Sequence, residues 1–340
     1  MNLLEDVKKS AKHLNKRIIL PESTEERTLK AADHILKEGI AQIILLGRPD
    51  EINQAAAEYN LKNIENATII DPGNNDKKQT YIDLLVKARE HKGMTKEEAA
   101  EHVLNPLCLS PLMIKNGDAD GSVAGAKNST GDVLRPAFRI LKTKPGINIV
   151  SGAFFMTLKD KSFGENGLLV FADGAVNPNP NEEQLAEIAI STADTTTKIT
   201  GIEPRVAMLS FSTYGSSEHE LAEKVANATN IAREKRPDLR IDGELQADAA
   251  LVEKIGRRKA KGSDIAGKAN VLIFPSLEAG NIGYKLVQRL ANATATGPVL
   301  QGLAAPINDL SRGCSVQDIM DMVAITSNMA ADTVDANVDK

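Results

Sequence analysis

The chain has 340 residues, more than one domain usually holds, so we expect two domains. Its net charge of −5 gives no general attraction to nucleic acid or anionic membranes, so an anionic ligand must be held by local arginines and lysines. With no tryptophan and few aromatic residues, the cores must be aliphatic. Cys108 and Cys314 lie far apart without metal-ligand spacing, which favours a reducing compartment over a disulfide or zinc framework.

The amino-terminal residues Met1–Val7 read as a short amphipathic helix with acidic residues early. They lack the basic-then-apolar layout of a signal peptide. No apolar run approaches the roughly 18 residues that would indicate a membrane span. We therefore predict a cytoplasmic protein without a membrane partner.

Short aliphatic runs alternate with helical patterns along the first half of the chain. Strands are predicted at Arg17–Glu22, Gln42–Gly47, Ala67–Asp71 and Gly121–Gly125, and helices at Glu25–Lys37, Lys77–His91 and Lys96–Leu104. Because these strands are largely apolar, we expect a parallel sheet that is covered on both faces.

The second half repeats this alternation. Strands are predicted at Ile147–Ser151, Phe154–Leu158, Leu168–Ala172, Val206–Ser210 and Val271–Phe274, and helices at Asn181–Thr192, Ser217–Arg233, Ala247–Lys254 and Leu277–Asn292. The turn Lys142–Gly146 is the best domain boundary, and the chain crosses back between Gly297 and Pro306. We therefore expect a first α/β domain of residues 1–146 plus about 305–340, and a second of residues 147–304.

The stretch from Gly302 to Asp318 carries the strongest functional pattern. Its first half reads as a loop, and a helix opens at Ser315, because Ser315 and Asp318 have helix-start spacing. Arg312 would then lie beside free helix amides, and such a corner suits a phosphate. The competing interpretation is that Asp318 only caps the helix and that Arg312 only tethers the loop.

The loop Gly117–Gly131 is rich in glycine and small hydroxyl side chains, and Arg135 follows it on a helix. It lacks the P-loop pattern. Its backbone NH groups, with Ser129 and Thr130, could cradle a phosphate at the next helix start. A simple strand-to-helix turn capped by Ser129 or Thr130 is an equally good interpretation.

Three further turns could border a ligand, although structural explanations compete with each. They are Asp173–Gly174, Ser210–Ser217 with a capping box between Ser217 and Glu220, and Glu278–Lys285 with Tyr284 and Arg289 on the following helix. No G-x-G-x-x-G follows a strand, no G-x-S-x-G elbow occurs, and no histidine falls in a metal or triad pattern.

Several blocks resemble one known family. The segments 302–315, 121–126, 130–136, 173–178 and 278–286 are similar, in family order, to the signatures of phosphate acetyltransferases (phosphotransacetylases). The length matches the short form of that family, which lacks amino-terminal regulatory domains.

The resemblance implies a reversible reaction in which acetyl-CoA and phosphate give acetyl phosphate and CoA. It also implies an α/β fold of the isocitrate/isopropylmalate dehydrogenase type, with two mostly parallel, helix-covered sheets and an active site in the interdomain cleft. A homodimer formed through the second domain, a metabolic link to acetate kinase, no metal and no bound cofactor are further implications. CoA is a substrate, and activation by K⁺ or NH₄⁺ is left open.

The resemblance also assigns residues. Asp318 would take the proton of the CoA thiol, while Arg312 and Ser311 would bind the phosphoryl group and the charge that develops on the carbonyl. The expected substrate-binding residues are Ser129, Thr130, Tyr284, Arg89, Arg135 and Arg289.

The chemistry limits these roles. The pKa of a thiol is about 8.5 and that of a carboxyl group is about 4, so full proton transfer from the thiol to Asp318 costs roughly 6 kcal/mol. We therefore expect Arg312 to stabilise the thiolate, or proton transfer to accompany attack, or burial to make Asp318 more basic. A rival mechanism uses an acidified Cys314 as the nucleophile, with an acetyl-cysteine intermediate.

Three other functions remain open at this point. Acyl-pocket size cannot be read from the sequence, so propionyl or butyryl transfer to phosphate is a close alternative. A nicotinamide-dependent dehydrogenase on the same architecture and a catalytically silent CoA-binding regulatory module are the others.

Overall fold

The computed structural model describes residues 3–331, which fold into two compact units. We call residues 3–144 with 303–331 the split unit, and residues 145–302 the continuous unit. Met1, Asn2 and residues 332–340, which our predictions included, lie outside the described residues. Among residues 3–331, no helix has the length and apolar run needed to cross a membrane.

The split unit contains a five-stranded sheet of order β11-β4-β1-β2-β3, in which every pairing is parallel. Its strands are β1 Arg17–Leu20, β2 Gln42–Leu46, β3 Thr68–Ile70, β4 Gly121–Ala124 and β11 Ile307–Asp309. Its helices are α1 Leu3–Leu14, α2 Glu26–Glu38, α3 Pro49–Glu58, α4 Lys78–Arg89, α5 Lys96–Val103, α6 Pro106–Lys115, α7 Thr130–Ile140 and α13 Val316–Met329, with short 3₁₀ turns at Ile64–Asn66 and Glu90–Lys92.

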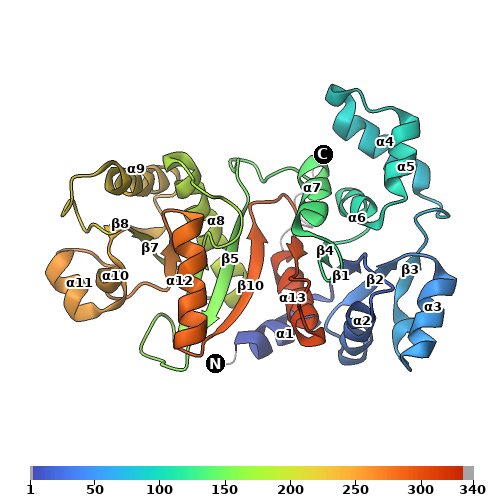
Figure 1. Ribbon diagram of the computed structural model, residues 1–340, viewed down its shortest axis with the longest axis horizontal. Helices are drawn as coiled ribbons and strands as arrows, with labels where there is room; N and C mark the ends of the chain where they lie inside the picture. The colour runs from blue at the N-terminus through green and yellow to red at the C-terminus, as the bar shows by residue number, and fades with distance from the viewer. Residues whose placement is uncertain (1–2, 332–340) are drawn as a thin grey trace. The chain divides into compact units, whose positions relative to one another are not determined.

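Helices cover both faces of this sheet. Helix α13 packs against α1, α2, β1 and β4, while α6 and α7 pack together and contact β4 and β11. In Figure 1, α6 and α7 lie on one side of β4, and α13 and α1 lie on the other. The strands are apolar because both faces are buried.

The continuous unit contains a six-stranded sheet of order β10-β5-β6-β9-β7-β8. Its strands are β5 Ser151–Thr157, β6 Leu168–Ala172, β7 Arg205–Leu209, β8 Arg240–Leu245, β9 Val271–Ile273 and β10 Thr294–Gln301. Its helices are α8 Glu182–Thr200, α9 Glu220–Lys235, α10 Ala247–Leu251, α11 Glu253–Lys259 and α12 Leu277–Leu290. The prediction of mostly parallel, helix-covered sheets is confirmed, although β5 runs antiparallel to both β6 and β10.

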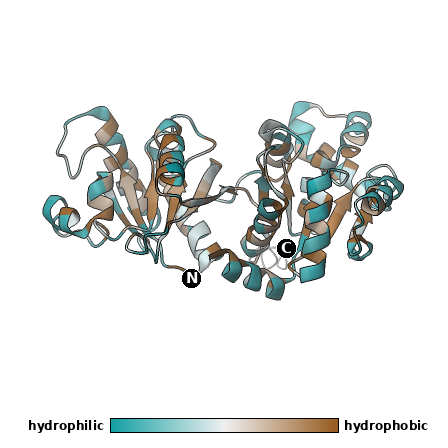
Figure 2. Ribbon diagram, turned by 60° about the horizontal axis from the view of Figure 1, so that its bottom comes forward, coloured by the Kyte–Doolittle hydropathy of each residue, from teal (hydrophilic) through white to brown (hydrophobic). Residues whose placement is uncertain are grey.

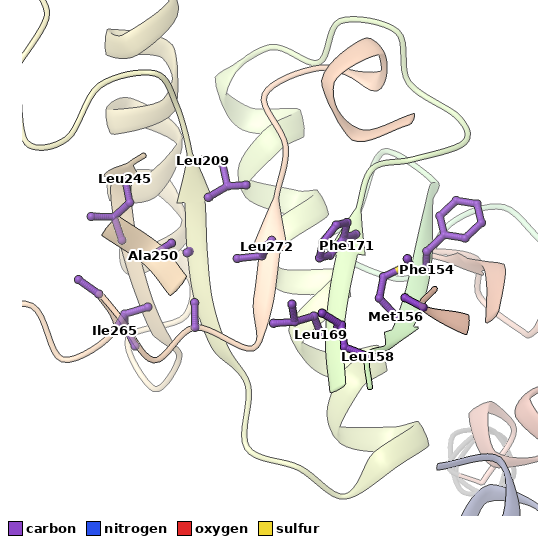
Figure 3. Packing of buried hydrophobic residues seen from close by; sticks show 14 of the residues in the cluster. Phe154, Met156, Leu158, Leu169, Phe171, Leu209, Leu245, Ala250, Ile265 and Leu272 are labelled. Atoms are coloured by element: carbon purple, nitrogen blue, oxygen red, sulfur yellow. The ribbon is translucent and has the colours of Figure 1, made fainter. Parts of the chain in front are cut away.

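The core of the continuous unit is aliphatic with a few phenylalanines. Figure 3 shows Phe154, Phe171, Leu272 and Leu209 along neighbouring strands, on one face of the sheet. Figure 2 shows that the strands of both units are largely hydrophobic, while the outer faces of the helices are hydrophilic.

Several predicted elements differ from the structure. Residues 147–150 of the strand predicted at Ile147–Ser151 are not strand. Ser151 instead begins β5, whose ladder with β10 continues through Gly152 into the second predicted strand. The helix predicted at Ala247–Lys254 is two helices separated by an extended Val252. Helix α8 continues to Thr200, beyond the predicted end at Thr192.

The capping box predicted between Ser217 and Glu220 is wrong. Helix α9 begins at Glu220, and the His219 side chain accepts the first capping bond, from the Leu221 amide. The Ser217 amide instead donates to the Ser212 hydroxyl. The loop closes on itself through Ser212, and His219 caps the helix in place of Ser217.

The first half of the 302–318 stretch is not only a loop, as was predicted. It contains β11, whose residues Ile307 and Asp309 pair with Ser122 and Ala124 of β4. This three-residue strand lies between loop-forming residues, so composition hides it. Helices α3 and α6 and strands β8 and β10 were not predicted either.

Candidate active site

The amino terminus of α7 offers amides rather than hydroxyl protons. Ser129 caps the helix, and its hydroxyl donates to Asp132 Oδ2 at 2.6 Å. The Thr130 hydroxyl donates inward to Asp309 Oδ2, also at 2.6 Å. The Thr130 and Gly131 amides have no acceptor among the described residues. An anion in front of α7 would therefore meet these two amides first.

The glycine-rich loop before α7 already wraps a carboxylate of the protein itself. Glu22 follows β1, is only 7% exposed, and accepts five hydrogen bonds. The donors, at 2.8–3.0 Å, are the amides of Gly125, Ala126, Lys127 and Asn128 and the side-chain amide of Asn128. The prediction that this loop's amides cradle a phosphate is therefore wrong for residues 125–128.

Gly125 makes this arrangement possible. Its φ of +108° lies in a region that side chains rarely adopt. A Cβ there would lie 2.4 Å from Asp309 Oδ1 and 2.6 Å from the Leu310 amide nitrogen. The loop can therefore lie directly against the end of β11 only with glycine at this position.

The amino terminus of α13 forms the second part of the site. Ser315 and Asp318 make a complete capping box, in which Asp318 Oδ2 accepts the amide and the hydroxyl of Ser315 at 2.8 and 2.9 Å. Asp318 Oδ1 has no hydrogen-bond partner within residues 3–331, and the side chain is exposed. Asp318 is thus a helix cap that keeps one oxygen available at the protein surface.

Arg312 keeps its full bonding capacity. Its side chain is exposed, and no carboxylate among the described residues pairs with its guanidinium. The adjacent Ser311 hydroxyl accepts the Gly313 amide at 3.2 Å, and the Cys314 amide donates to the Ser311 carbonyl. A tight turn therefore presents Arg312 immediately before the free amides of α13.

One guanidinium joins the two loops. Arg27, on α2, donates from Nη1 to the carbonyls of Arg312 and Cys314, and from Nη2 to the carbonyl of Ala126, each at 2.8 Å. Its Nε binds Glu25 Oε1 at 2.7 Å. Since one planar group reaches all three carbonyls, the turn that bears Arg312 and the loop that leads to Thr130 lie side by side.

Arg89 and Arg135 line a pocket of ≈ 260 Å³ in the split unit. Arg139, His102 and Cys108 line it too, and Arg89 Nε is buried without a hydrogen-bond partner among the described residues. Arg135 lies 3.9 Å from Asp132. Three guanidiniums around one pocket can hold an anionic group, and Asn128 and Asp132 at the start of α7 line the same pocket.

Tyr284 and Arg289 belong to α12 of the continuous unit. Tyr284 stacks on Phe154 with ring centroids 3.9 Å apart, and burial raises the pKa of its hydroxyl. A Cβ at Gly280 would lie 2.2 Å from the Asp173 carbonyl oxygen. Gly280 therefore lets α12 pack closely against the end of β6, which is a structural reason for a glycine at this position. A substrate-binding role for Tyr284 and Arg289 stays a prediction.

The remaining predicted turns have structural explanations. Asp173 is buried and accepts amides from Gly152, Ala175, Val176 and Asn177 and the Asn177 side chain. In the 210–217 loop, Glu244 accepts the Ser212 hydroxyl and the Gly215 amide. These carboxylates close their turns and leave little capacity for a ligand.

Cys314 is not activated. It is buried, and burial raises the pKa of its thiol despite the nearby Arg27 guanidinium. A thiol in this state is a poor nucleophile at neutral pH, which counts against the acetyl-cysteine mechanism.

Sequence reasoning missed Glu22, Arg27, Asp309 and Arg139. Glu22, Arg27 and Asp309 bind residues that are distant in the sequence. The separations are 103–106 residues for Glu22, 99–287 for Arg27 and 179 for Asp309. Only the position of Glu22 just after the apolar run of β1 could have suggested its role, because ligands gather where parallel strands end.

Comparisons with known proteins agree with this architecture. Residues 2–327 match the family model described as phosphate acetyl/butaryl transferase. The chain is 54% identical to a phosphate acetyltransferase of Thermoanaerobacterium thermosaccharolyticum, over 97% of this chain and 100% of the relative. It is 53% identical to a phosphate acetyltransferase of Clostridium acetobutylicum, over 96% and 98%. The structure of the EutD phosphotransacetylase from Staphylococcus aureus superposes with a TM-score of 0.91 at 41% identity, covering 97% and 98%.

The two-unit α/β fold and these relatives define an acyltransferase. The chain belongs to the phosphate acetyl/butaryl transferase family.

Proposed function

We propose that this chain catalyses the reversible reaction of acetyl-CoA with phosphate to give acetyl phosphate and CoA. The names of its relatives support the activity. The observation that carries the proposal is the Arg27 bridge, because it holds the turn bearing Arg312 against the loop leading to Thr130. The Arg312 guanidinium, which has no carboxylate partner among residues 3–331, and the free amides at the starts of α7 and α13 suit a phosphoryl group.

In the proposed reaction, the CoA thiol loses its proton to Asp318 Oδ1 as its sulfur attacks the carbonyl carbon of acetyl phosphate. The carbonyl oxygen becomes an oxyanion, which Arg312 and the neighbouring amides stabilise. Collapse of the tetrahedral intermediate breaks the bond from carbon to the phosphate oxygen and forms the thioester. Phosphate leaves with the electron pair, beside the same cation.

Asp318 needs help in this step, because a carboxylate is a much weaker base than a thiolate. Arg312 supplies it, since its free guanidinium can stabilise the thiolate before attack and the oxyanion after it. Direct transfer in a ternary complex then needs no acyl-enzyme, which agrees with the raised pKa of the Cys314 thiol.

The pocket at Arg89 is the proposed place for the phosphates of CoA. Arg89 and Arg135 provide the cations, and the buried, unpartnered Nε of Arg89 can donate to a phosphate oxygen. Ser129 and Thr130 would contribute to phosphoryl binding at α7. Tyr284 and Arg289 keep their proposed roles from the resemblance.

The test is thioester formation from acetyl phosphate and CoA, followed by ultraviolet absorbance. Propionyl and butyryl phosphate are compared at matched concentrations. The proposal predicts rapid turnover with the acetyl substrate and a lower kcat/KM with the longer ones. A higher kcat/KM for butyryl phosphate would make the chain a butyryltransferase, and no turnover with intact CoA binding would favour a silent CoA-binding module.

On the resemblance alone, we also propose a cytoplasmic homodimer formed through residues 147–304 and linked to acetate kinase through acetyl phosphate. Light scattering at micromolar concentration tests the dimer. Turnover with K⁺ or NH₄⁺ in place of Na⁺ tests cation activation.

A further inference from the structure

Asp309 is a buried carboxylate beside Thr130, where the phosphoryl group is proposed to bind, and one of its oxygens accepts no hydrogen bond from residues 3–331. It ends β11, is 4% exposed, and lies two residues before Ser311. Its Oδ2 accepts one hydrogen bond, from the Thr130 hydroxyl, at 2.6 Å. Its Oδ1 is buried and has no partner among residues 3–331. Buried carboxylates of this kind usually have several donors, so this one needs an explanation.

The surroundings favour a proton on Asp309. Burial, with a smaller contribution from the negative Glu22, raises the pKa of its carboxyl to about 6, against the lowering effects of the Thr130 hydroxyl and, more weakly, the Leu310 amide. Of the other charged groups on elements packed against β11, Asp132, Arg135, Arg139 and Asp318 are exposed, and Asp321 pairs with Lys8. Within residues 3–331, no cation therefore forms an ion pair with Asp309.

The protonation state of Asp309 decides what Thr130 can offer to a ligand. When Asp309 is ionised, the Thr130 hydroxyl must point its proton inward, and only lone pairs face outward. A phosphoryl dianion in front of α7 needs donors, so this arrangement repels it. When Oδ2 carries a proton, the same 2.6 Å contact serves in reverse, with Asp309 donating to Thr130 Oγ1. The threonine proton is then free to point outward, and no heavy atom has to move.

We propose that Asp309 is a positioning residue that takes up one proton from solvent when a phosphoryl group binds beside Thr130, which turns the Thr130 hydroxyl into a donor to that group. The inference rests on the proposed function, because it places the phosphoryl group at the amino terminus of α7. The proton comes from water or buffer and returns to it when the phosphoryl compound leaves. No covalent bond to carbon or phosphorus changes in this step.

The first test follows the KM for acetyl phosphate from about pH 6 to about pH 8.5, a range that lies above the titration of Asp309. For the wild type we expect KM to rise with pH, by up to about tenfold per unit. Asp309→Asn should make the profile flat, because its side-chain NH₂ donates to Thr130 Oγ1 at every pH. The matched variant Thr130→Val should give a high KM that no longer depends on Asp309. Ionisation of acetyl phosphate is common to all three proteins and cancels in the comparison.

The second test does not need turnover. Acetyl phosphate is titrated into the wild-type protein without CoA, by calorimetry at about pH 7.5 in two buffers with different ionisation enthalpies. We expect uptake of close to one proton per site, and a value near zero in Asp309→Asn. Binding without proton uptake by the wild type, or a wild-type pH slope in Asp309→Asn, would overturn the inference. Absent thioester formation would instead refute the proposed function, which this binding experiment does not measure.

Discussion

Glu22 and Asp309 both lie close to Gly125, and both are buried carboxylates near the ends of strands, yet the numbers of their hydrogen-bond donors differ sharply. Glu22 accepts five hydrogen bonds, four of them from consecutive backbone amides. Asp309 accepts one. A carboxylate whose lone pairs are satisfied stabilises its charge and holds a loop, whereas one with free capacity can still exchange a proton. Glu22 therefore holds the loop in front of α7, whereas Asp309 can change its protonation state when a ligand binds.

The same distinction separates other parts of the molecule. Asp173 in the continuous unit, with five donors, resembles Glu22 and closes a turn. Arg312 and Asp318 resemble Asp309, since each keeps unused donors or acceptors. We therefore expect substitutions at Glu22 and Asp173 to reduce stability, substitutions at Arg312 and Asp318 to reduce activity, and substitution of Asp309 to change the pH dependence.

The largest effect is expected for Arg312→Gln. Because this guanidinium is unpaired and exposed, its loss should lower kcat by about 10²–10³-fold while leaving the Tm within about 2 °C. Steady-state kinetics and thermal unfolding measure the two effects. Arg48→Gln, on the surface beside Asp50 and Glu51, is the matched control and should change neither. A large drop in Tm for Arg312→Gln would mean that Arg312 tethers the loop.

Glu22→Gln should act mainly on stability. The new NH₂ group would face two backbone amides that now donate to Oε2, so we expect a loss of about 2–4 kcal/mol in the free energy of unfolding. Urea unfolding measures it, with the exposed Glu65→Gln as the control. Unchanged stability would show that the five hydrogen bonds to Glu22 do not hold the loop.

Asp309→Asn should stabilise the protein in a pH-dependent way. The folded-state pKa of about 6 lies above the ordinary value of 3.8, so ionised Asp309 destabilises the fold increasingly as pH rises through this window. We expect the variant to gain about 1–3 kcal/mol at pH 7.5 and almost nothing near pH 4. Urea unfolding at the two pH values gives the comparison. An equal gain at both would assign the effect to packing.

Cys314→Ala is expected to have the smallest effect. Burial raises the pKa of this thiol, so it should not carry the acetyl group, and kcat should stay within about twofold of the wild type. Initial rates with both substrates varied should give intersecting lines rather than the parallel lines of a ping-pong mechanism. A loss of tenfold or more in kcat, together with parallel lines in the wild type, would restore the acetyl-cysteine intermediate.

Local patterns in the sequence predicted the features that depend on neighbouring residues. The capping box of Ser315 and Asp318 and the helix that it opens were both found, because the partners lie three residues apart. The role of Glu22 was not found, since its donors lie more than 100 residues away and the sequence does not show which loop returns to β1. The glycine-rich loop looked like a phosphate cradle for the same reason, because sequence alone cannot show that a carboxylate of the protein fills it.

The strand β11 shows a related limit. Three residues between glycine and proline on one side and a tight turn on the other carry no periodic signal, and only pairing with β4 makes them a strand. Asp309 owes its burial to that pairing, so its chemistry could not be predicted before the sheet was known. Similarly, the Arg27 bridge needs three segments that only the fold brings together.

The most direct test of the central claim is kcat for thioester formation by Asp318→Asn. Asparagine can still accept the Ser315 amide, so the cap and the Tm should be retained while the base is lost. We predict a fall of about 10²-fold or more in kcat, with little change in KM for either substrate. Wild-type turnover in this variant would reduce Asp318 to a helix cap and contradict its role as the base.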